Sequence, residues 1–283
     1  GSRLPRIDGI QHVTGQTKYV SDFYLPGMLW VKVLRSPHHS AKILRIDTSK
    51  AEKVPGVVKV LTHKDVPANI YMGDMPVFVV DDVRYKGQEI AAVVAVDEDT
   101  AMEGVSKIKV QYEERPAVFD VYEAMKPDAP QITPTGNFLM FNNKQFRPVR
   151  KGDVESAFAK ADFIFEGEYR TQAQEQTPIE TQCSVVEPKA DGRFVIHTVS
   201  QAIFFHLGAL AGILNVPQGR IQSVGGIVGG GFGSKNEIHA DHITAVAALR
   251  TGKPCKWLWT REEELIASTA RGATHMHFKE GVM

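Results

Sequence analysis

A run of glycines in the second half of the chain constrains the structure more than any other stretch. Glycine occupies six of the thirteen positions from Val224 to Asn236, and Phe232 is the only aromatic residue among them. Glycine loses more conformational entropy on folding than any other residue, and this run has almost no side chains to pack. Its backbone N–H groups can approach a negatively charged group closely. Because Glu237 to Arg250 predicts a helix, we expect the loop to deliver an anion or a cofactor to a helix N-terminus.

Two common phosphate-binding motifs do not match this loop. The P-loop requires a serine or threonine after its lysine, whereas Lys235 is followed by Asn236. The dinucleotide fingerprint requires a third glycine where this chain has Ser234. A strained structural turn and an unrelated phosphate-binding module stay open as alternatives, and nucleotide binding at the loop would identify the second.

Composition narrows the class of partner. The formal net charge is zero and the pI is about 7.3, which argues against nucleic acid and against an acidic membrane surface. Only two cysteines occur, Cys183 and Cys255, so neither an iron–sulfur cluster nor a zinc site of the chain's own is expected. The sequence has no apolar run of membrane-spanning length and no signal peptide, which predicts a cytoplasmic protein.

At 283 residues, two domains are expected. Residues 1–125 predict an α+β domain with a buried strand at Ile90–Val96, a helix capped by Asp97, and a returning strand at Ile108–Tyr112. Residues 126–152 are rich in proline and asparagine without a sustained period, which is typical of a linker.

Residues 153–283 predict a second, mixed α+β domain. Its apolar helix at Gln201–Asn215 leads to a strand at Arg220–Val224, and that strand enters the glycine loop. Further strands are predicted at Met28–Leu34, Lys42–Asp47, Val57–Leu61, Phe163–Gln174, Cys183–Val186, Phe194–Val199, Cys255–Trp259 and Thr274–Phe278, with a short helix at Arg261–Ser268.

Some polar residues could carry chemistry or could simply be solvated. His239 and His242 share a face of the predicted helix, but a polar helix start explains them as well as a metal site does. Glu175 and Glu180 could form an acid–base pair or lie on a solvated strand face. Lys235, beside an expected anion site, is a candidate for contact with a cofactor.

Several of these segments, in this order, resemble one protein family. V-G-G-G-F-G-S-K at 228–235 resembles the G-G-G-F-G-G-K loop of the molybdenum hydroxylases, the xanthine dehydrogenase and aldehyde oxidase family. Thr198–Gln201 resembles the S-T-Q segment of that family, and Gln174–Thr181 resembles its Q-E-H-x-x-x-E-T segment. Tyr85–Val96 and Val110–Pro116 are similar to its hammerhead domain.

The resemblance implies a fold and a cofactor. The expected fold is an α+β hammerhead domain followed by the first part of a mixed α+β molybdopterin-binding domain. The expected cofactor is molybdopterin, whose dithiolene holds the molybdenum, so no residue is expected to ligate the metal directly. Such enzymes oxidise an aldehyde or an N-heterocycle with oxygen from water, and pass electrons to iron–sulfur clusters and FAD, here expected only on partner chains.

The resemblance also implies roles for individual residues. Gln201 would donate a hydrogen bond to the oxo group of the molybdenum. Backbone and side-chain contacts to the cofactor would come from Gly229, Gly230, Gly231, Phe232, Gly233 and Lys235. Xanthine-specific members have a glutamate where this chain has Asn236, so Asn236 is the candidate on the substrate side and purine is a doubtful substrate. A shift of one residue, to Glu237, stays open.

The general base of this family is a glutamate that the resemblance places outside this chain. The expected partners are therefore the remaining part of the molybdopterin subunit, iron–sulfur and flavin subunits, and a small-molecule substrate. The chain alone is expected to fold, to bind no molybdenum and to be inactive. The alternative is a non-catalytic docking portion that binds no cofactor by itself.

Overall fold

The computed structural model describes every residue of the chain except 2, 72, 134–135 and 139–148. The described residues divide into two compact units, Gly1–Arg115 with Gln176–Thr269, and Pro116–Glu175 with Ala270–Met283. The first unit takes residues from both predicted domains, and the boundaries predicted at 125 and 152 stay a prediction. Part of the predicted linker lies outside the described residues.

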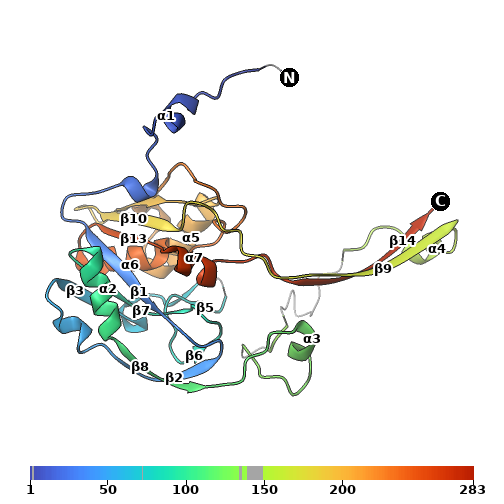
Figure 1. Cartoon of the computed structure of the whole chain (residues 1–283), viewed down its shortest axis with the longest axis horizontal. Coiled ribbons are helices and arrows are strands. Elements are labelled where there is room, and N and C mark those ends of the chain that lie inside the picture. Colours follow the sequence, from blue (N-terminus) through green and yellow to red (C-terminus); the bar gives the residue numbers. More distant parts are fainter. Residues whose placement is uncertain (2, 72, 134–135, 139–148) are drawn as a thin grey trace. The chain divides into compact units, whose positions relative to one another are not determined.

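A seven-stranded mixed sheet forms the centre of the first unit (Figure 1). Its strands, in spatial order, are β12 (Ile221–Gly225), β11 (Phe194–Thr198), β10 (Cys183–Pro188), β13 (Cys255–Leu258), β1 (Leu29–Arg35), β7 (Glu89–Ala95) and β3 (Val57–Leu61). Strand β13 pairs parallel to β1 and antiparallel to β10, so it joins segments from the two halves of the chain. All seven residues of β7 are buried, as its uninterrupted apolar run predicts.

Helices cover both faces of this sheet. Ala92 and Val94 of β7 belong to the main core, with residues of α5 (Ile203–Leu214) and α6 (Asp241–Thr251). Ala91 and Val93 point to the opposite face, where α2 (Glu98–Lys107) packs against β1 and β7. The predicted cap of α2 is confirmed, because the Asp97 carboxylate accepts a hydrogen bond from the Thr100 N–H.

Smaller elements complete the first unit. They are a sheet of β6 (Asp82–Val83), β2 (Ala41–Asp47) and β8 (Lys109–Glu114), the pair β4 (Ile70–Tyr71) and β5 (Met75–Pro76), helices α1 (Gly9–Val13) and α7 (Arg261–Ala267), and four 3₁₀ turns at Val20–Asp22, Ala51–Lys53, His63–Asp65 and Gln218–Arg220.

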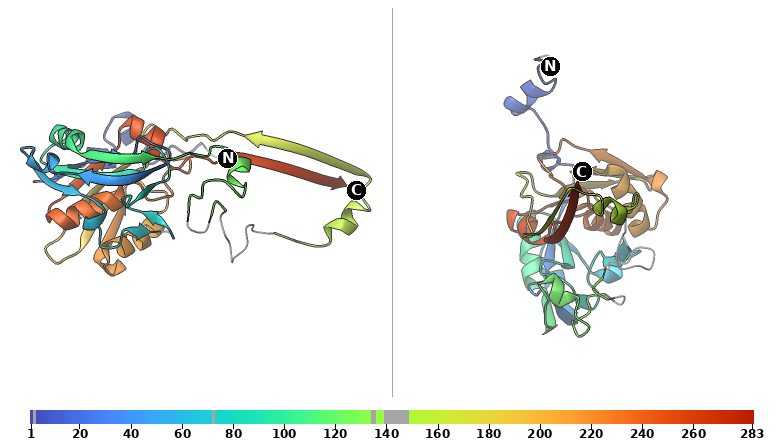
Figure 2. Two further views of the ribbon diagram at one scale, coloured as in Figure 1. Left: turned by 90° about the horizontal axis from the view of Figure 1, so that it is seen from below. Right: turned by 90° about the vertical axis from the view of Figure 1, so that its right-hand side faces the viewer.

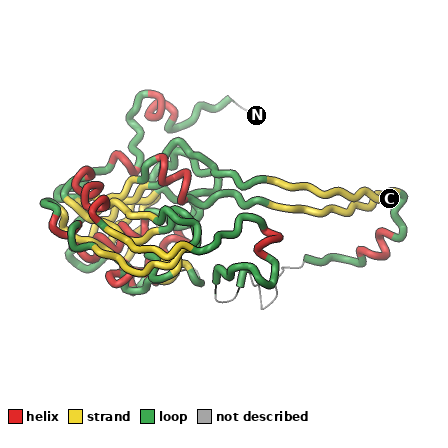
Figure 3. Tube along the Cα trace, turned by 60° about the horizontal axis from the view of Figure 1, so that its bottom comes forward, coloured by secondary structure: helices red, strands yellow, loops and turns green. Residues whose placement is uncertain are grey.

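The second unit is built on an antiparallel ribbon of two strands, β9 (Phe163–Thr171) and β14 (Thr274–Val282) (Figures 2 and 3). The pairing runs from Thr171 opposite Thr274 to Phe163 opposite Val282. Two short helices, α3 (Val121–Ala124) and α4 (Val154–Phe158), belong to the same unit. The α+β fold class is confirmed. No helix in the described part of the chain is long and apolar enough to cross a lipid bilayer.

Candidate functional site

The backbone of the glycine loop, which connects β12 with α6, has an alternating conformation. Gly230, Phe232 and Gly233 have positive φ angles of 98°, 54° and 102°. Gly229 and Gly231, which alternate with the first two, do not have positive φ angles. A left-handed conformation is rare for a bulky residue such as phenylalanine and is energetically costly. Alternation of this kind turns successive N–H groups toward one point, where an anion or a polar ligand can accept from them.

A second feature of the loop is a run of three backbone N–H groups. Those of Gly230, Gly231 and Phe232 have no acceptor among the residues that the structure describes. The Phe232 side chain is 73% exposed. The loop therefore has the unbonded donors that the sequence predicts for a cradle.

Gln201 lies between β11 and α5 and is tied to the loop by two hydrogen bonds. Its backbone N–H donates to the Lys235 carbonyl at 2.8 Å, and its side-chain Oε1 accepts from the Gly233 N–H at 3.0 Å. Because the loop uses the oxygen of the amide, the Nε2 group is left as a donor, and none of the described residues accepts from it. Gln201 thus presents an oriented N–H donor beside the three loop N–H groups.

Four of the six glycines lie close to the protein's own side chains, and two of these, Gly225 and Gly226, lie against Ile203 and Val20. A Cβ on Gly229 would lie 2.6 Å from the Cβ of Glu180, and a Cβ on Gly231 would lie 2.3 Å from Oε1 of Gln201. The expectation that this run has no packing role is therefore wrong at these positions. The loop is therefore packed closely against Glu180 and Gln201.

A buried ion pair between Lys235 and Glu180 attaches the loop to the segment before β10. The Lys235 ammonium is fully buried and lies 2.8 Å from Oε2 of Glu180, and the same oxygen accepts from the Gly229 N–H at 2.7 Å. Glu180 is thus engaged by the loop, and its expected acid–base partnership with Glu175 has no support from this contact. The direct cofactor contact expected of Lys235 stays a prediction, since the ammonium here faces Glu180.

Two buried oxygen atoms near this pair have no hydrogen-bond partner among the described residues, Oε1 of Glu180 and Oε1 of Gln176. Gln176 lies beside the loop, because a Cβ on Gly233 would be 3.9 Å from its Nε2. Buried polar atoms without partners are rare in native structures, and a bound ligand or an ordered water is one explanation for them. A cofactor with polar groups therefore fits the donors and acceptors of this site.

The helix after the loop begins four residues later than predicted, at Asp241 rather than Glu237. Ile238 and Ala240 pack into the main core, and the Asp241 carboxylate is buried at the helix N-terminus. An acidic side chain there already interacts favourably with the helix dipole. The predicted delivery of a ligand to this helix end is therefore wrong, and the loop amides themselves are the candidate cradle.

The two residues after Lys235 have different surroundings. Asn236, the candidate on the substrate side, is exposed. Oε2 of Glu237 accepts from the Thr269 hydroxyl at 2.9 Å, and Glu237 lines a cavity of about 140 Å³, to which Gln201 does not contribute. The one-residue shift from Asn236 to Glu237 is not supported by this geometry.

His239 and His242 line the same cavity, and burial lowers the pKa of His239 to about 4 and that of His242 to about 3. Among the residues described, no group of three metal-binding side chains occurs. The alternative of a histidine metal site therefore has no support.

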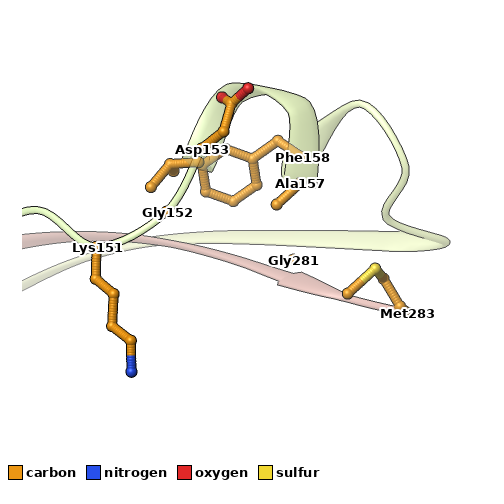
Figure 4. Close-up of a pocket in the computed structure, with 8 residues that line it drawn as sticks. Lys151, Gly152, Asp153, Ala157, Phe158, Gly281 and Met283 are labelled. Carbon is orange, nitrogen blue, oxygen red and sulfur yellow. The ribbon is translucent and has the colours of Figure 1, made fainter.

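Another pocket, of about 340 Å³, lies in the second unit beside α4 and the end of β14 (Figure 4). Asp153 lines it and caps α4 through the Ser156 N–H. None of the predicted site residues lines this pocket.

Sequence reasoning misses the partners that hold the site together. The sequence suggests acid–base chemistry for Glu180 rather than a pairing with Lys235, and it does not single out Gln176 at all. It also misses His206, although a single histidine inside the apolar helix I-F-F-H-L-G-A-L-A-G-I-L indicates a buried polar contact.

Comparisons with known proteins extend these observations. A family model described as the molybdopterin cofactor-binding domain matches residues 139–283. A second, described as the a/b hammerhead domain of aldehyde oxidase and xanthine dehydrogenase, matches residues 14–116. These two models match most of the chain.

Individual relatives agree with the family models. A protein of Bacillus subtilis named as a probable xanthine dehydrogenase subunit is 37% identical over 98% of this chain and 37% of its own length. The nicotinate dehydrogenase large molybdopterin subunit of Eubacterium barkeri is 30% identical over 99% of this chain and 66% of its own length. The aldehyde oxidoreductase structure from Desulfovibrio gigas aligns with a TM-score of 0.90 and 29% identity, covering 99% of this chain and 32% of that one. The chain thus spans between about a third and two thirds of these proteins.

Proposed function

Since the chain belongs to the xanthine dehydrogenase and aldehyde oxidase family of molybdenum hydroxylases, we propose that its glycine loop and Gln201 hold molybdopterin. The observation that carries this proposal is the set of four unbonded donors, the N–H groups of Gly230, Gly231 and Phe232 and the Nε2 group of Gln201. When bound, the cofactor supplies a redox-active molybdenum that oxidises a substrate carbon with oxygen derived from water.

Each residue of the site has a role in this proposal. The loop amides would donate to the cofactor, and Gln201 would donate a hydrogen bond to it from Nε2. Both are held before the cofactor arrives, by the Gly233-to-Gln201 bond and by the Lys235–Glu180 pair. Donors fixed in advance stabilise a developing charge without reorganisation, which is the largest single contribution in many enzymes. Lys235 contributes by pairing with Glu180 and so holding the loop in place.

We propose that the substrate is an aldehyde or an N-heterocycle and that Asn236 approaches it. An exposed neutral amide at this position can donate and accept hydrogen bonds, whereas a carboxylate can only accept. Glu237 faces the cavity of Thr269 instead. A purine held by a carboxylate is therefore the less favoured substrate class.

Electron transfer requires carriers beyond these residues. Cys183 and Cys255 are the only cysteines of the chain, and both are fully buried on β10 and β13. Burial raises the pKa of each thiol to about 12, which disfavours the thiolate that binds iron. We propose that partner subunits carry the iron–sulfur clusters and FAD, and that the assembly is cytoplasmic.

Molybdenum and pterin analysis tests the proposal. The complete enzyme, assembled with its partner subunits, is expected to contain one molybdenum and one pterin for each copy of this chain. The 283 residues alone are expected to contain neither. Both samples are then offered aldehyde and N-heterocycle substrates with an artificial electron acceptor. A complete enzyme without molybdenum, or a chain that turns substrate over alone, would contradict this account.

A further inference from the structure

A buried set of hydrogen bonds lies directly behind Gln201 and the end of the glycine loop. His206, in the first half of α5, is 2% exposed, and its Nδ1 lies 2.8 Å from Oδ2 of Asp241. Its Nε2 lies 3.2 Å from the Ser200 hydroxyl and 3.2 Å from the Asn236 carbonyl. Oδ2 of Asp241 also accepts from the Thr198 hydroxyl at 2.8 Å. One imidazole therefore connects Ser200, which follows β11, with the loop and with α6.

The groups around His206 favour its protonated form. Nδ1 faces the Asp241 carboxylate, which can only accept, whereas Nε2 faces both the Asn236 carbonyl, which can only accept, and the Ser200 hydroxyl, which can donate or accept. A neutral ring protonated at Nδ1 would donate to Asp241 and accept from Ser200 but leave the Asn236 carbonyl without a donor, whereas an imidazolium donates to both Asp241 and the Asn236 carbonyl. Burial lowers the pKa of His206, but the hydrogen bond and charge of Asp241, with the backbone of Asn236 and Glu237, outweigh it and raise the pKa above 6.5.

The contacts of His206 continue the attachment of Gln201 to the loop. The backbone of Gln201 bonds the Lys235 carbonyl directly. Ser200 precedes Gln201 and Asn236 follows Lys235. The Ser200 hydroxyl and the Asn236 carbonyl both contact Nε2 of His206. The ring thus links the pair of residues, Ser200 and Asn236, that lies next to the directly bonded pair Gln201 and Lys235.

We propose that His206, paired with Asp241, is a positioning residue that keeps Gln201 and the glycine loop in a fixed mutual geometry. The proposal rests on the proposed function only for its effect on turnover, since the geometry itself can be measured without cofactor. His206 touches neither the loop donors nor the Nε2 group of Gln201, and it acts through Ser200 and Asn236.

The groups that face His206 favour its charged form. Asp241 is the opposing charge, and the Glu237 backbone also raises the pKa of the ring. His239 and His242 would repel it if they were protonated, but burial holds their pKa values at about 4 and about 3. The positioning contact is therefore expected to be complete at pH values below the ordinary histidine pKa of about 6.5 and to weaken as pH rises through the raised pKa of His206.

Hydrogen exchange of the full chain, followed by NMR, tests this role. The reporters are the amides of Gln201 and Gly233, which bond Lys235 and Gln201. Replacing His206→Gln removes the charged double donor, so protection of both amides is expected to fall on the order of 10-fold. The imidazole nitrogens of the wild type are expected to show the ¹⁵N shifts of an imidazolium at about pH 6.5, the ordinary pKa of histidine.

His242→Gln is the matched control, because His242 is equally buried and adjacent to Asp241 but makes no hydrogen bond to Ser200 or Asn236 among the described residues. It is expected to leave both reporter amides protected. Ser200→Ala, which keeps the His206–Asp241 pair, provides a second variant if His206→Gln does not fold, and protection at Gln201 should fall in it. Unchanged protection in these variants, an equal loss in His242→Gln, or a neutral imidazole in the wild type at that pH would overturn the proposal.

Discussion

At the scale of single residues, the site depends on which polar atoms already form hydrogen bonds within the protein and which do not. The loop uses the oxygen of the Gln201 amide and one oxygen of Glu180. Among the described residues, Nε2 of Gln201 and three backbone N–H groups are left without acceptors. A glycine motif in the sequence indicates that the backbone lies close to a neighbouring group, but it does not identify whether that group is a ligand or a side chain of the protein. In this chain, Gly231 is needed because Gln201 lies against it, and Gly230 because its φ is 98°.

The contact between Gly231 and Gln201 gives a prediction for the full chain. Gly231→Ala places a methyl group 2.3 Å from Oε1 of Gln201, so it is expected to lower the free energy of unfolding by about 1–3 kcal/mol. In a Gln201→Ala background the obstructing amide is gone, and the same substitution should cost about 0.5 kcal/mol or less. Urea unfolding of the four proteins measures this coupling. Equal costs in the two backgrounds would show that the close contact is not what requires glycine.

At the scale of elements, the sequence predicts local structure better than the partners of each element. The run Ile90–Val96 followed by Asp97 specifies a buried strand and a capped helix, because these signals are local. The start of α6 lies four residues beyond its predicted position, since the partners of Asp241 lie in β11 and α5. Nothing near position 235 in the sequence identifies Glu180 as the partner of Lys235.

The Lys235–Glu180 pair joins the segment before β10 to the glycine loop, which predicts a large effect on stability. Lys235→Met leaves the Glu180 carboxylate buried without its cation, and the expected loss in the free energy of unfolding is about 3 kcal/mol. The exposed pair of Glu103 and Lys107 on α2 is the control, and Lys107→Met is expected to change stability by about 0.5 kcal/mol or less. Denaturant unfolding that gives the same small change for both variants would mean that this pair does not hold the loop.

At the scale of the whole molecule, strand β13 explains why the first unit combines both predicted domains. It lies between β1 and β10, and these pairings connect strands that are far apart in the sequence. Pairing over such separations depends on the complete core, so periodicity predicts the strands without predicting their order. The family resemblance predicts the cofactor and the fold class, whereas the interactions that orient Gln201 and the loop become visible only in the structure.

The central claim is that Gln201 is oriented by the loop to donate its Nε2 hydrogen bond at the cofactor, and turnover of the complete enzyme tests it most directly. Gln201→Ala is compared with Gln218→Ala, which changes an exposed glutamine beyond the other end of α5, at equal measured molybdenum content. Loss of one preorganised donor is expected to lower kcat on the order of 10²–10³-fold in Gln201→Ala, with the control unchanged. An unchanged kcat in Gln201→Ala at full molybdenum occupancy would contradict the account.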